Sequence, residues 1–294
     1  MKKYVSYAYV LLGATCWGFI GVFNRLLASA GVDMANRVFV RNFFSLLLLT
    51  LVFALFRRDV FHVKPRDLPI FAASGLLSIL TLSWAYFNCQ MECSLAVAAI
   101  LLYLAPSMVV VMSALLWKTP ITRRKGAALL LSLLGCALVS GVVGGALTGT
   151  PRGLLLGVAS AFCYATYTIF AHYGLARYDA YTMIYWTFVF AGLGSLLFLD
   201  WGALAPALAT ARGGGGAVGL VLVATVLPYL FYTKGLEGVE GGKAAILANV
   251  EPVVAALLGV ALFHERLSAW VLLGVVCVLG GAALLAKEDT RGEA

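Results

Sequence analysis

The residue with the clearest chemical potential is Glu251, a carboxylate deep inside the apolar stretch 244–265. On a helix it shares a stripe with small residues at spacings of three and four, namely Ala244, Ala248, Ala255 and Gly259. An ionisable group at such depth is costly and is expected on the path of a solute or an ion. We therefore predict that Glu251 accepts a proton or pairs with a cation. The alternatives are a neutral acid that packs helices, or one bonded to a carbonyl that Pro252 frees.

Polar and aromatic side chains at helical spacing form a second set with chemical potential. Lipid offers them no partners, so they should face one another or water inside a bundle. A cavity rimmed by tyrosine and tryptophan suits a small solute with a flat or apolar part and a cationic or zwitterionic head. The predicted binding residues are Trp17, Asn24, Trp84, Asn88, Tyr103, Tyr164, Tyr167, Tyr229 and Tyr232. The alternative for any one of them is interhelical hydrogen bonding or an interfacial aromatic belt.

The stripe on the segment that starts near residue 68 consists of Ser74, Ser78, Thr81, Trp84 and Asn88. A second stripe, on the segment 153–172, consists of Ser160, Tyr164, Thr168 and His172. Both stripes should point into the bundle rather than toward lipid.

The motifs of enzymes and cofactor sites match this sequence poorly. Residues 214–219 spell G-x-G-x-x-G, but no strand is expected before them, and His264-Glu265 lacks the second histidine of a zinc protease helix. Cys89 and Cys93 are one helical turn apart with no nearby histidine, which matches no zinc pattern. We predict no enzymatic activity, no cofactor and no metal site.

Composition places the chain in a membrane. Hydrophobic residues make up 62% of its 294 residues, charged residues 12%, and the mean hydropathy is +0.97, whereas soluble domains carry about 25% charged residues. The formal charge of +8 is spread between apolar runs rather than gathered on one face or tail. This distribution argues against a nucleic-acid partner and for orientation in the lipid bilayer.

Charged residues, glycines and prolines divide the sequence into ten apolar segments. Each is about as long as the roughly 20 residues that a helix needs to cross a bilayer. They span residues 5–29, 35–56, 68–89, 94–117, 125–143, 153–172, 180–200, 216–234, 244–263 and 269–286. The fold class is therefore an all-α polytopic membrane protein. Within this scheme the glycine run 213–216 is expected in an outer loop, and Arg41 is expected to snorkel to the outer surface rather than pair inward with an acid.

The sequence contains two copies of one unit. Subtracting 146 takes Pro252 onto Pro106 and the run 244–247 onto 98–101, which has the same four residues, while Glu251 falls on Ala105. Five crossings per copy make the second copy start from the opposite face. We therefore predict two inverted five-helix repeats, residues 1–145 and 151–287, with a short cytoplasmic tail at 288–294. Such repeats place binding sites at their interface near the midplane.

Most of the 21 lysine and arginine residues fall in loops on the side of the amino terminus. The positive-inside rule then predicts a plasma-membrane protein with both termini in the cytoplasm. A homodimer is a further possibility that the sequence leaves open.

Several motifs carry a resemblance to a known family. They are L-L-G and C-W-G at 11–18, Y-L-A-P at 103–106, K-T-P-I-T at 118–122, E-P-V-V-A-A-L-L-G at 251–259, H-E-R-L-S at 264–268 and W-V-L-L-G at 270–274. In this doubled order the chain resembles the EamA family of the drug/metabolite transporter superfamily over about residues 8–286. Thr119 departs from the family, which often has a glutamate there.

The resemblance implies a ten-helix secondary transporter of small metabolites, commonly amino acids, amines or drug-like cations, often moved outward. It also implies a site between segments 1–4 and 6–9, with segments 5 and 10 peripheral. We predict an exporter of amino acids or amines that works by alternating access, coupled to protons through Glu251 or uncoupled. The alternatives are multidrug efflux of aromatic or quaternary cations and, from another class, a membrane-embedded enzyme or assembly factor.

Overall fold

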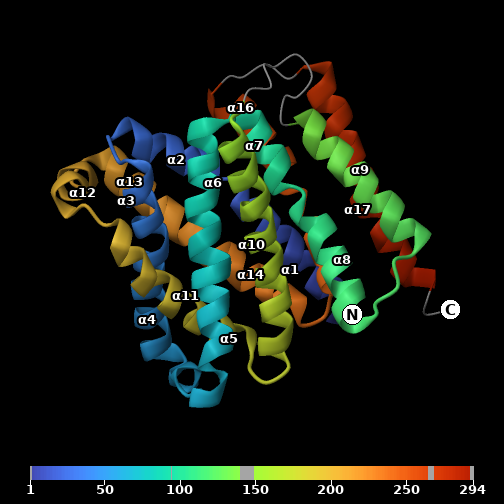
Figure 1. Cartoon of the computed structure of the whole chain (residues 1–294), viewed down its shortest axis with the longest axis horizontal. Coiled ribbons are helices and arrows are strands. Elements are labelled where there is room, and N and C mark those ends of the chain that lie inside the picture. The colour runs from blue at the N-terminus through green and yellow to red at the C-terminus, as the bar shows by residue number, and fades with distance from the viewer. Residues whose placement is uncertain (1, 94, 140–148, 264–267, 292–294) are drawn as a thin grey trace.

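The protein is a bundle of helices (Figure 1). The computed structural model describes residues 2–93, 95–139, 149–263 and 268–291, and every regular element within them is a helix. The predicted all-α class is therefore confirmed for the described residues. His264 and Glu265, which we expect to act as a cap or gate pair at the outer turn, lie outside them.

Eight helical stretches of the described residues are long and apolar enough to cross a membrane. They are Tyr4–Ser29, Met34–Phe56, Pro65–Glu92, Val97–Trp117, Pro151–Leu175, Ala180–Phe198, Ala211–Leu236 and Gly241–Phe263. Each coincides with a predicted segment to within a few residues. The fifth and tenth segments form α9 (Arg123–Val139, 17 residues) and α17 (Ala269–Arg291), whose apolar part is Ala269–Leu284. Since these two are shorter, the count of ten crossings stays a prediction.

Most crossings consist of more than one helical piece. In the first half the pieces are α1 (Lys2–Trp17), α2 (Ile20–Ser29), α3 (Met34–Phe39), η1 (Val40–Phe44), α4 (Ser45–Phe56), η2 (Arg58–Phe61), η3 (Pro65–Asp67), α5 (Leu68–Ala72), η4 (Ala73–Leu80), α6 (Thr81–Glu92), α7 (Leu95–Leu102) and α8 (Ala105–Trp117). In the second half they are α10 (Pro151–Leu175), α11 (Ala180–Ser195), η5 (Leu196–Phe198), α12 (Trp201–Leu208), α13 (Ala211–Val221), η6 (Leu222–Val226), α14 (Leu227–Leu236), α15 (Gly241–Ala248) and α16 (Glu251–Phe263).

Side-chain caps fix where several helices begin. The first N–H groups of a helix have no partner within it, and a preceding Asp or Thr oxygen can accept from one of them. The residues that cap in this way are Asp33, Thr150, Asp179, Asp200 and Thr210. All five stand between apolar segments, so the short polar connections determine the ends of the crossings.

Helix interruptions recur at the offset of the sequence repeat. Tyr103 and Leu104 separate α7 from α8, and 146 positions later Asn249 and Val250 separate α15 from α16. In both cases proline is the second residue of the following helix, where its missing N–H is tolerated. The π-helical η4, shifted by 146, covers 219–226 and so contains the π-helical η6. The two halves thus share irregular backbone as well as sequence.

The halves contact each other closely through small and hydroxyl residues. Ser74 and Thr187 share a hydrogen bond of 2.9 Å, and Ser78 and Thr166 share one of 2.8 Å, all four side chains being buried. Between the two serines, a Cβ placed on Gly75 would lie 2.4 Å from the carbonyl oxygen of Thr187. Ser74 and Ser78 therefore point into the bundle, as predicted, and each forms an interhelical hydrogen bond.

The glycine run 213–216 was predicted as an outer loop, and this prediction is wrong. It lies within α13, which Thr210 caps by accepting from Gly213 N–H. A Cβ on Gly216 would lie 3.1 Å from Leu26, and one on Gly219 would overlap the ring of Phe23. The glycines are helical because α2 packs directly on the α13 backbone, a gain that outweighs their low helix propensity.

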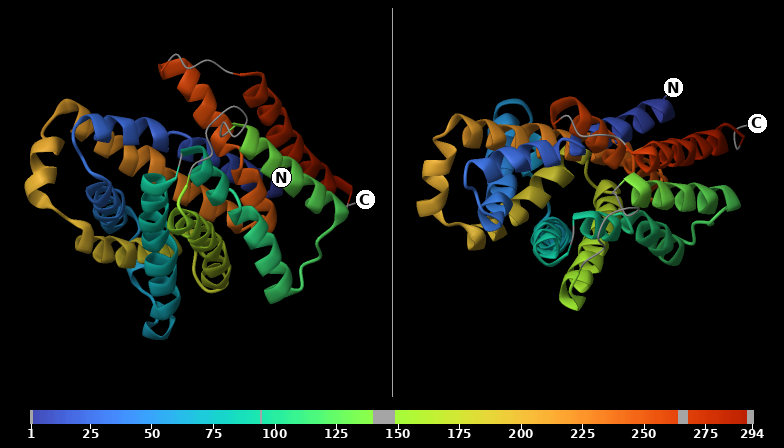
Figure 2. Two further views of the ribbon diagram at one scale, coloured as in Figure 1. Left: turned by 45° about the horizontal axis from the view of Figure 1, so that its top comes forward. Right: turned by 90° about the horizontal axis from the view of Figure 1, so that it is seen from above.

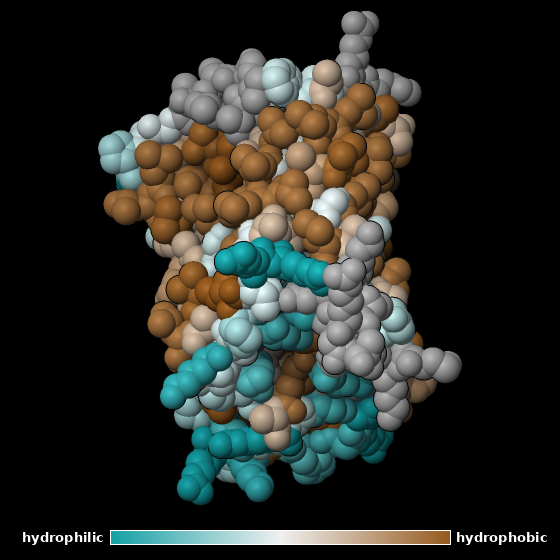
Figure 3. All heavy atoms as spheres, turned by 90° about the vertical axis from the view of Figure 1, so that its right-hand side faces the viewer, coloured by the Kyte–Doolittle hydropathy of each residue, from teal (hydrophilic) through white to brown (hydrophobic). Residues whose placement is uncertain are grey.

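One end of the bundle is hydrophilic, as the space-filling view shows at its lower side (Figure 3). This hydrophilic end holds Arg57, Asp59, Asp67, Lys125, Arg177, Asp179, Lys234, Glu237 and Glu240. Both chain ends are marked in the lower half of Figure 1, whereas α10 begins at the top. Helices α9 and α17 lie side by side at one edge of the bundle, as expected for peripheral segments (Figure 2).

Replacement of Gly75 by alanine tests the close contact between the halves. The added methyl would displace backbone rather than a flexible side chain, so we expect Gly75→Ala to destabilise the protein by about 1–3 kcal/mol. Thermal unfolding of the purified protein measures the change. Gly126→Ala is the matched control, since a Cβ there meets nothing within 4 Å. Equal stability of the two variants would contradict the packing.

Candidate functional site

Glu251 is the first residue of α16, directly after the interruption between α15 and α16. The positive end of the α16 dipole favours a carboxylate at this position. The side chain is partly exposed, and within the described part of the chain no hydrogen bond or ion pair engages it. The interruption between α1 and α2 lies close by, since a Cβ on Gly18 would be 3.2 Å from the Glu251 carbonyl oxygen. Two broken helices from opposite halves therefore meet at the acid.

Arg41 is the counter-charge of this acid. It lies on the π-helical η1, its residue is only 7% exposed, and its Nε has no hydrogen-bond partner among the described residues. Its guanidinium attracts the Glu251 carboxylate and lies beside the Tyr229 hydroxyl. The predicted snorkelling of Arg41 is wrong, because η1 packs against α11 and α13 and keeps the side chain inside.

Four of the predicted aromatic residues surround the ring of Trp17 or pack on its neighbours. Trp17 is 4% exposed, and its ring centroid lies 5.4 Å from Tyr229, 5.2 Å from Tyr232 and 6.1 Å from Tyr164. Tyr167 completes the group at 5.2 Å from Tyr229. We call these five residues the aromatic cluster. It joins α1 of the first half to α10 and α14 of the second.

Hydroxyl pairs tie two tyrosines of the cluster to their surroundings. Tyr167 and Thr233 share a hydrogen bond of 2.5 Å, and Tyr232 and Thr168 share one of 3.0 Å. All four side chains are buried. Their polar groups are therefore satisfied, and both pairs join α10 to α14 within the second half.

Tyr103 and Tyr86 lie near the Glu251 carboxylate, and both are partly exposed. Tyr103 was predicted from the sequence and occupies the interruption between α7 and α8. Tyr86 on α6 was not among the predicted binding residues. Its match to Tyr232 at the repeat offset was the signal that could have identified it, because Tyr232 belongs to the aromatic cluster.

The structure does not bring the other three predicted residues to the cluster. Trp84 is 39% exposed, and Asn88 donates a hydrogen bond to the Trp84 carbonyl within α6 at 2.8 Å. Both lie on a different face of α6 from Tyr86. Asn24 lies farther along α2, with its Oδ1 buried and without a partner among the described residues.

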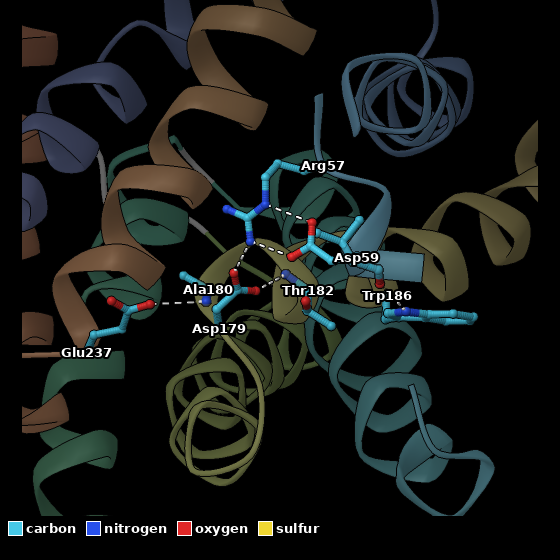
Figure 4. A network of polar contacts seen from close by, with 8 residues as sticks. Arg57, Asp59, Asp179, Ala180, Thr182, Trp186 and Glu237 are labelled. Atoms are coloured by element: carbon cyan, nitrogen blue, oxygen red, sulfur yellow. Dashed lines mark hydrogen bonds and ion pairs between the residues drawn. The ribbon is translucent and has the colours of Figure 1, made fainter. Parts of the chain in front are cut away.

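Ion pairs join the halves at the hydrophilic end. The guanidinium of Arg57 donates to Asp59 and, at 2.7 Å, to Asp179 of the second half (Figure 4). In the same network, Glu237 accepts from the Ala180 N–H and the Trp186 indole donates to the Val60 carbonyl.

Two further pairs cross between the halves at this end. Arg177 and Tyr178 both donate to the carboxylate of Asp67, and Lys125 pairs with Glu240. We call these contacts, together with Arg57–Asp179, the ionic clasp. At the opposite end Glu92 pairs with Arg152 at 3.2 Å, where the chain passes from the first half to the second.

A sequence profile of the EamA-like transporter family matches residues 5–141 and again residues 151–287. The chain belongs to the EamA-like transporter family. The double match covers both halves that the helix interruptions relate to each other. The protein is thus a transporter of the drug/metabolite superfamily, as its motifs indicated.

Relatives of this EamA-like transporter span its whole length. An uncharacterized transporter of Archaeoglobus fulgidus is 30% identical over 288 residues, which is 96% of each chain. The uncharacterized inner membrane transporter YicL of Salmonella typhimurium is 26% identical and covers 96% of this chain and 95% of its own. A crystal structure with 19% sequence identity has a TM-score of 0.79 and covers 98% of this chain and 99% of that one, which supports the fold.

In this EamA-like transporter the clasp has a defined response to pH. Burial acts to raise the pKa of the Asp179 carboxyl, but hydrogen bonds from Thr182 and Arg57 outweigh it and hold that pKa below its usual value of 3.8. A carboxyl with a lowered folded-state pKa stabilises the protein above its unfolded-state pKa, and this contribution is lost as the pH falls through the folded-state value. The Asp179 carboxyl of the clasp is therefore charged at neutral pH.

Asp179→Asn tests this contribution, because asparagine still caps α11 but carries no charge. We expect a loss below about 1 kcal/mol, since the pair is partly exposed. The stability difference from the wild type should be constant from neutral pH to about pH 5 and should shrink below about pH 4. Thermal unfolding across this range measures it, and a difference that grows toward acid pH would refute the assignment.

Proposed function

We propose that the protein is a secondary transporter that exports a small organic metabolite, an amino acid or an amine, across the plasma membrane by alternating access. The observation that carries the proposal is the pair of opposite charges, Arg41 and Glu251, that the two halves hold among buried aromatic rings. Charges inside a membrane bundle are expensive and are typical of solute or ion paths.

The chemistry of this site suits a zwitterion or an amine. An arginine is the preferred partner of a carboxylate, and a glutamate without a protein partner can take an ammonium group. Tyr164 is partly exposed and interacts electrostatically with both charges, so its ring is placed to contact a cation or an apolar side chain. An amine would use Glu251 alone, whereas an amino acid would use both charges.

Alternating access requires one end of the seam between the halves to open while the other closes. The ionic clasp, whose pairs join the two halves, supports a state that is closed toward the hydrophilic end. We assign this end to the cytoplasm, with both termini there, because it carries most of the loop lysines and arginines. Opening it would break the clasp.

We further propose that residues 1–145 and 151–287 form two inverted repeats of five crossings each, α9 and α17 being the fifth and tenth. The matching interruptions of α7–α8 and α15–α16 support this arrangement, since such pairs mark binding sites of transporters built from repeats. The start of α10 at the end opposite to the termini also supports it (Figure 1).

Efflux of aromatic or quaternary cations is the second candidate function. The observation that favours it is the partly exposed carboxylate of Glu251 beside Tyr86 and Tyr103, with no ion pair in the described part of the chain. Such a substrate has no carboxylate, so Arg41 would contribute nothing attractive to its binding. The two functions therefore differ in their dependence on Arg41.

Flux of radiolabelled amino acids and amines in proteoliposomes tests both functions. We expect Glu251→Gln to abolish transport of either class. Arg41→Gln should reduce amino-acid flux by about tenfold or more, because a charge-assisted hydrogen bond contributes about 1.5–3 kcal/mol, and should leave amine flux within about twofold.

Control variants keep these outcomes interpretable. Trp84→Leu alters an exposed side chain away from the aromatic cluster and should transport like the wild type. Loss of flux in Glu251→Gln with retained substrate binding would argue that the coupling ion is a proton. Unchanged flux in Glu251→Gln would refute the site, and efflux of lipophilic dyes that compete with metabolites would favour the second function.

A further inference from the structure

A pocket of about 310 Å³ lies at the hydrophilic end, away from Glu251. Helix α8 contributes Ser113 and Trp117, α10 contributes Thr168 and His172, and the connection from α14 to α15 contributes 237–241. The pocket therefore lies on the seam between the halves. Its volume is at the lower limit for ligand sites, about 300–1,000 Å³.

Both acidic side chains of the lining are paired with lysines. Glu240 pairs with Lys125, which is 3% exposed, and Glu237 pairs with Lys234 at 2.5 Å. Neither lysine lines the pocket, whereas both glutamates do. Of these paired groups, the carboxylates line the pocket and the ammonium groups do not, which favours a cation over an anion.

Ring faces add to this preference. The ring centroids of Trp117 and His172 are 4.0 Å apart, and Trp117 also lies 5.6 Å from Tyr173. Trp117 lines the pocket together with His172. An indole is the best partner for an organic cation, which it attracts through its ring face.

Unpartnered hydroxyls indicate that the pocket is a built site rather than a packing defect. Ser113 is 1% exposed, and its Oγ has no hydrogen-bond partner among the described residues. The Oγ1 of Thr119, also in the lining, is likewise buried without one. Buried hydroxyls normally have partners, so these two are polar groups of the lining that the described part of the protein leaves unsatisfied.

We propose that this pocket is a second binding site, separate from Glu251, that takes a small organic ammonium ion. The evidence that the pocket is separate from the Glu251 site is Thr168. This residue lines the pocket, and its hydroxyl forms a hydrogen bond with the fully buried Tyr232 of the aromatic cluster. Because the ion touches both halves beside the Lys125–Glu240 pair, its binding strengthens the closed hydrophilic end. The site does not depend on the transported substrate.

Calorimetric titration of the purified full-length protein with tetramethylammonium chloride tests the proposal. Sodium chloride controls for ionic strength and tert-butanol for an uncharged ligand of similar shape. We expect saturable binding of tetramethylammonium alone. Trp117→Leu should weaken it by about 3- to 30-fold through loss of the cation–π contact, and Trp201→Leu, on the exposed surface of α12, should not.

His172 offers a second variant that does not disturb a buried group, because its side chain is exposed. His172→Arg places a fixed positive charge in the pocket and should abolish binding, whereas His172→Gln should retain it. Glu251→Gln should also retain it, even if that variant no longer transports. Absence of binding to the wild type, equal binding of tert-butanol, or loss of binding in Glu251→Gln but not in His172→Arg would each overturn the proposal.

Discussion

Lipid offers no hydrogen-bonding partner, and this constraint determines how every polar group of the bundle is placed. Most comply by pairing with one another. Ser74 bonds with Thr187, Ser78 with Thr166 and Tyr167 with Thr233, and these pairs hold helices together. The groups that do not comply are therefore informative. Arg41 Nε and the Glu251 carboxylate have no hydrogen-bond partner in the described chain, which is the main physical reason to place a solute between them.

Interrupted helices make such a site possible. A continuous helix satisfies its own backbone and exposes only side chains, whereas a break provides a positive helix end and a local change of direction. The breaks at Tyr103 and at Asn249 occupy equivalent positions of the two repeats, but Ala105 stands where Glu251 stands in the second. In the site that we propose, the two halves share backbone geometry but differ in chemistry, since one supplies the acid and the other the arginine.

Hydropathy predicted the crossings because the length of an apolar segment is a local property of the sequence. Helical spacing predicted the inward-facing residues, because the periodicity of a helix places them on one face. These residues are Trp17, Tyr164, Tyr229 and Tyr232. The sequence could not predict the direction of Arg41, which depends on the π-helical turn of η1 and its packing. Trp84 lies on the same helix as Tyr86, yet only the neighbours of α6 decide which face is inside. The glycines of α13 were misassigned because their helical state depends on contact with α2.

The interruption between α1 and α2 at Gly18 and Phe19 has no equivalent in α10, which is continuous from Pro151 to Leu175. At the interruption the Phe19 N–H donates to the Cys16 carbonyl, three residues back, in place of the regular helical bond to the fourth residue back. The first helices of the two repeats therefore differ in regularity. In the alternating-access motion that we propose, we expect bending to concentrate at this interruption, beside Glu251, rather than in α10.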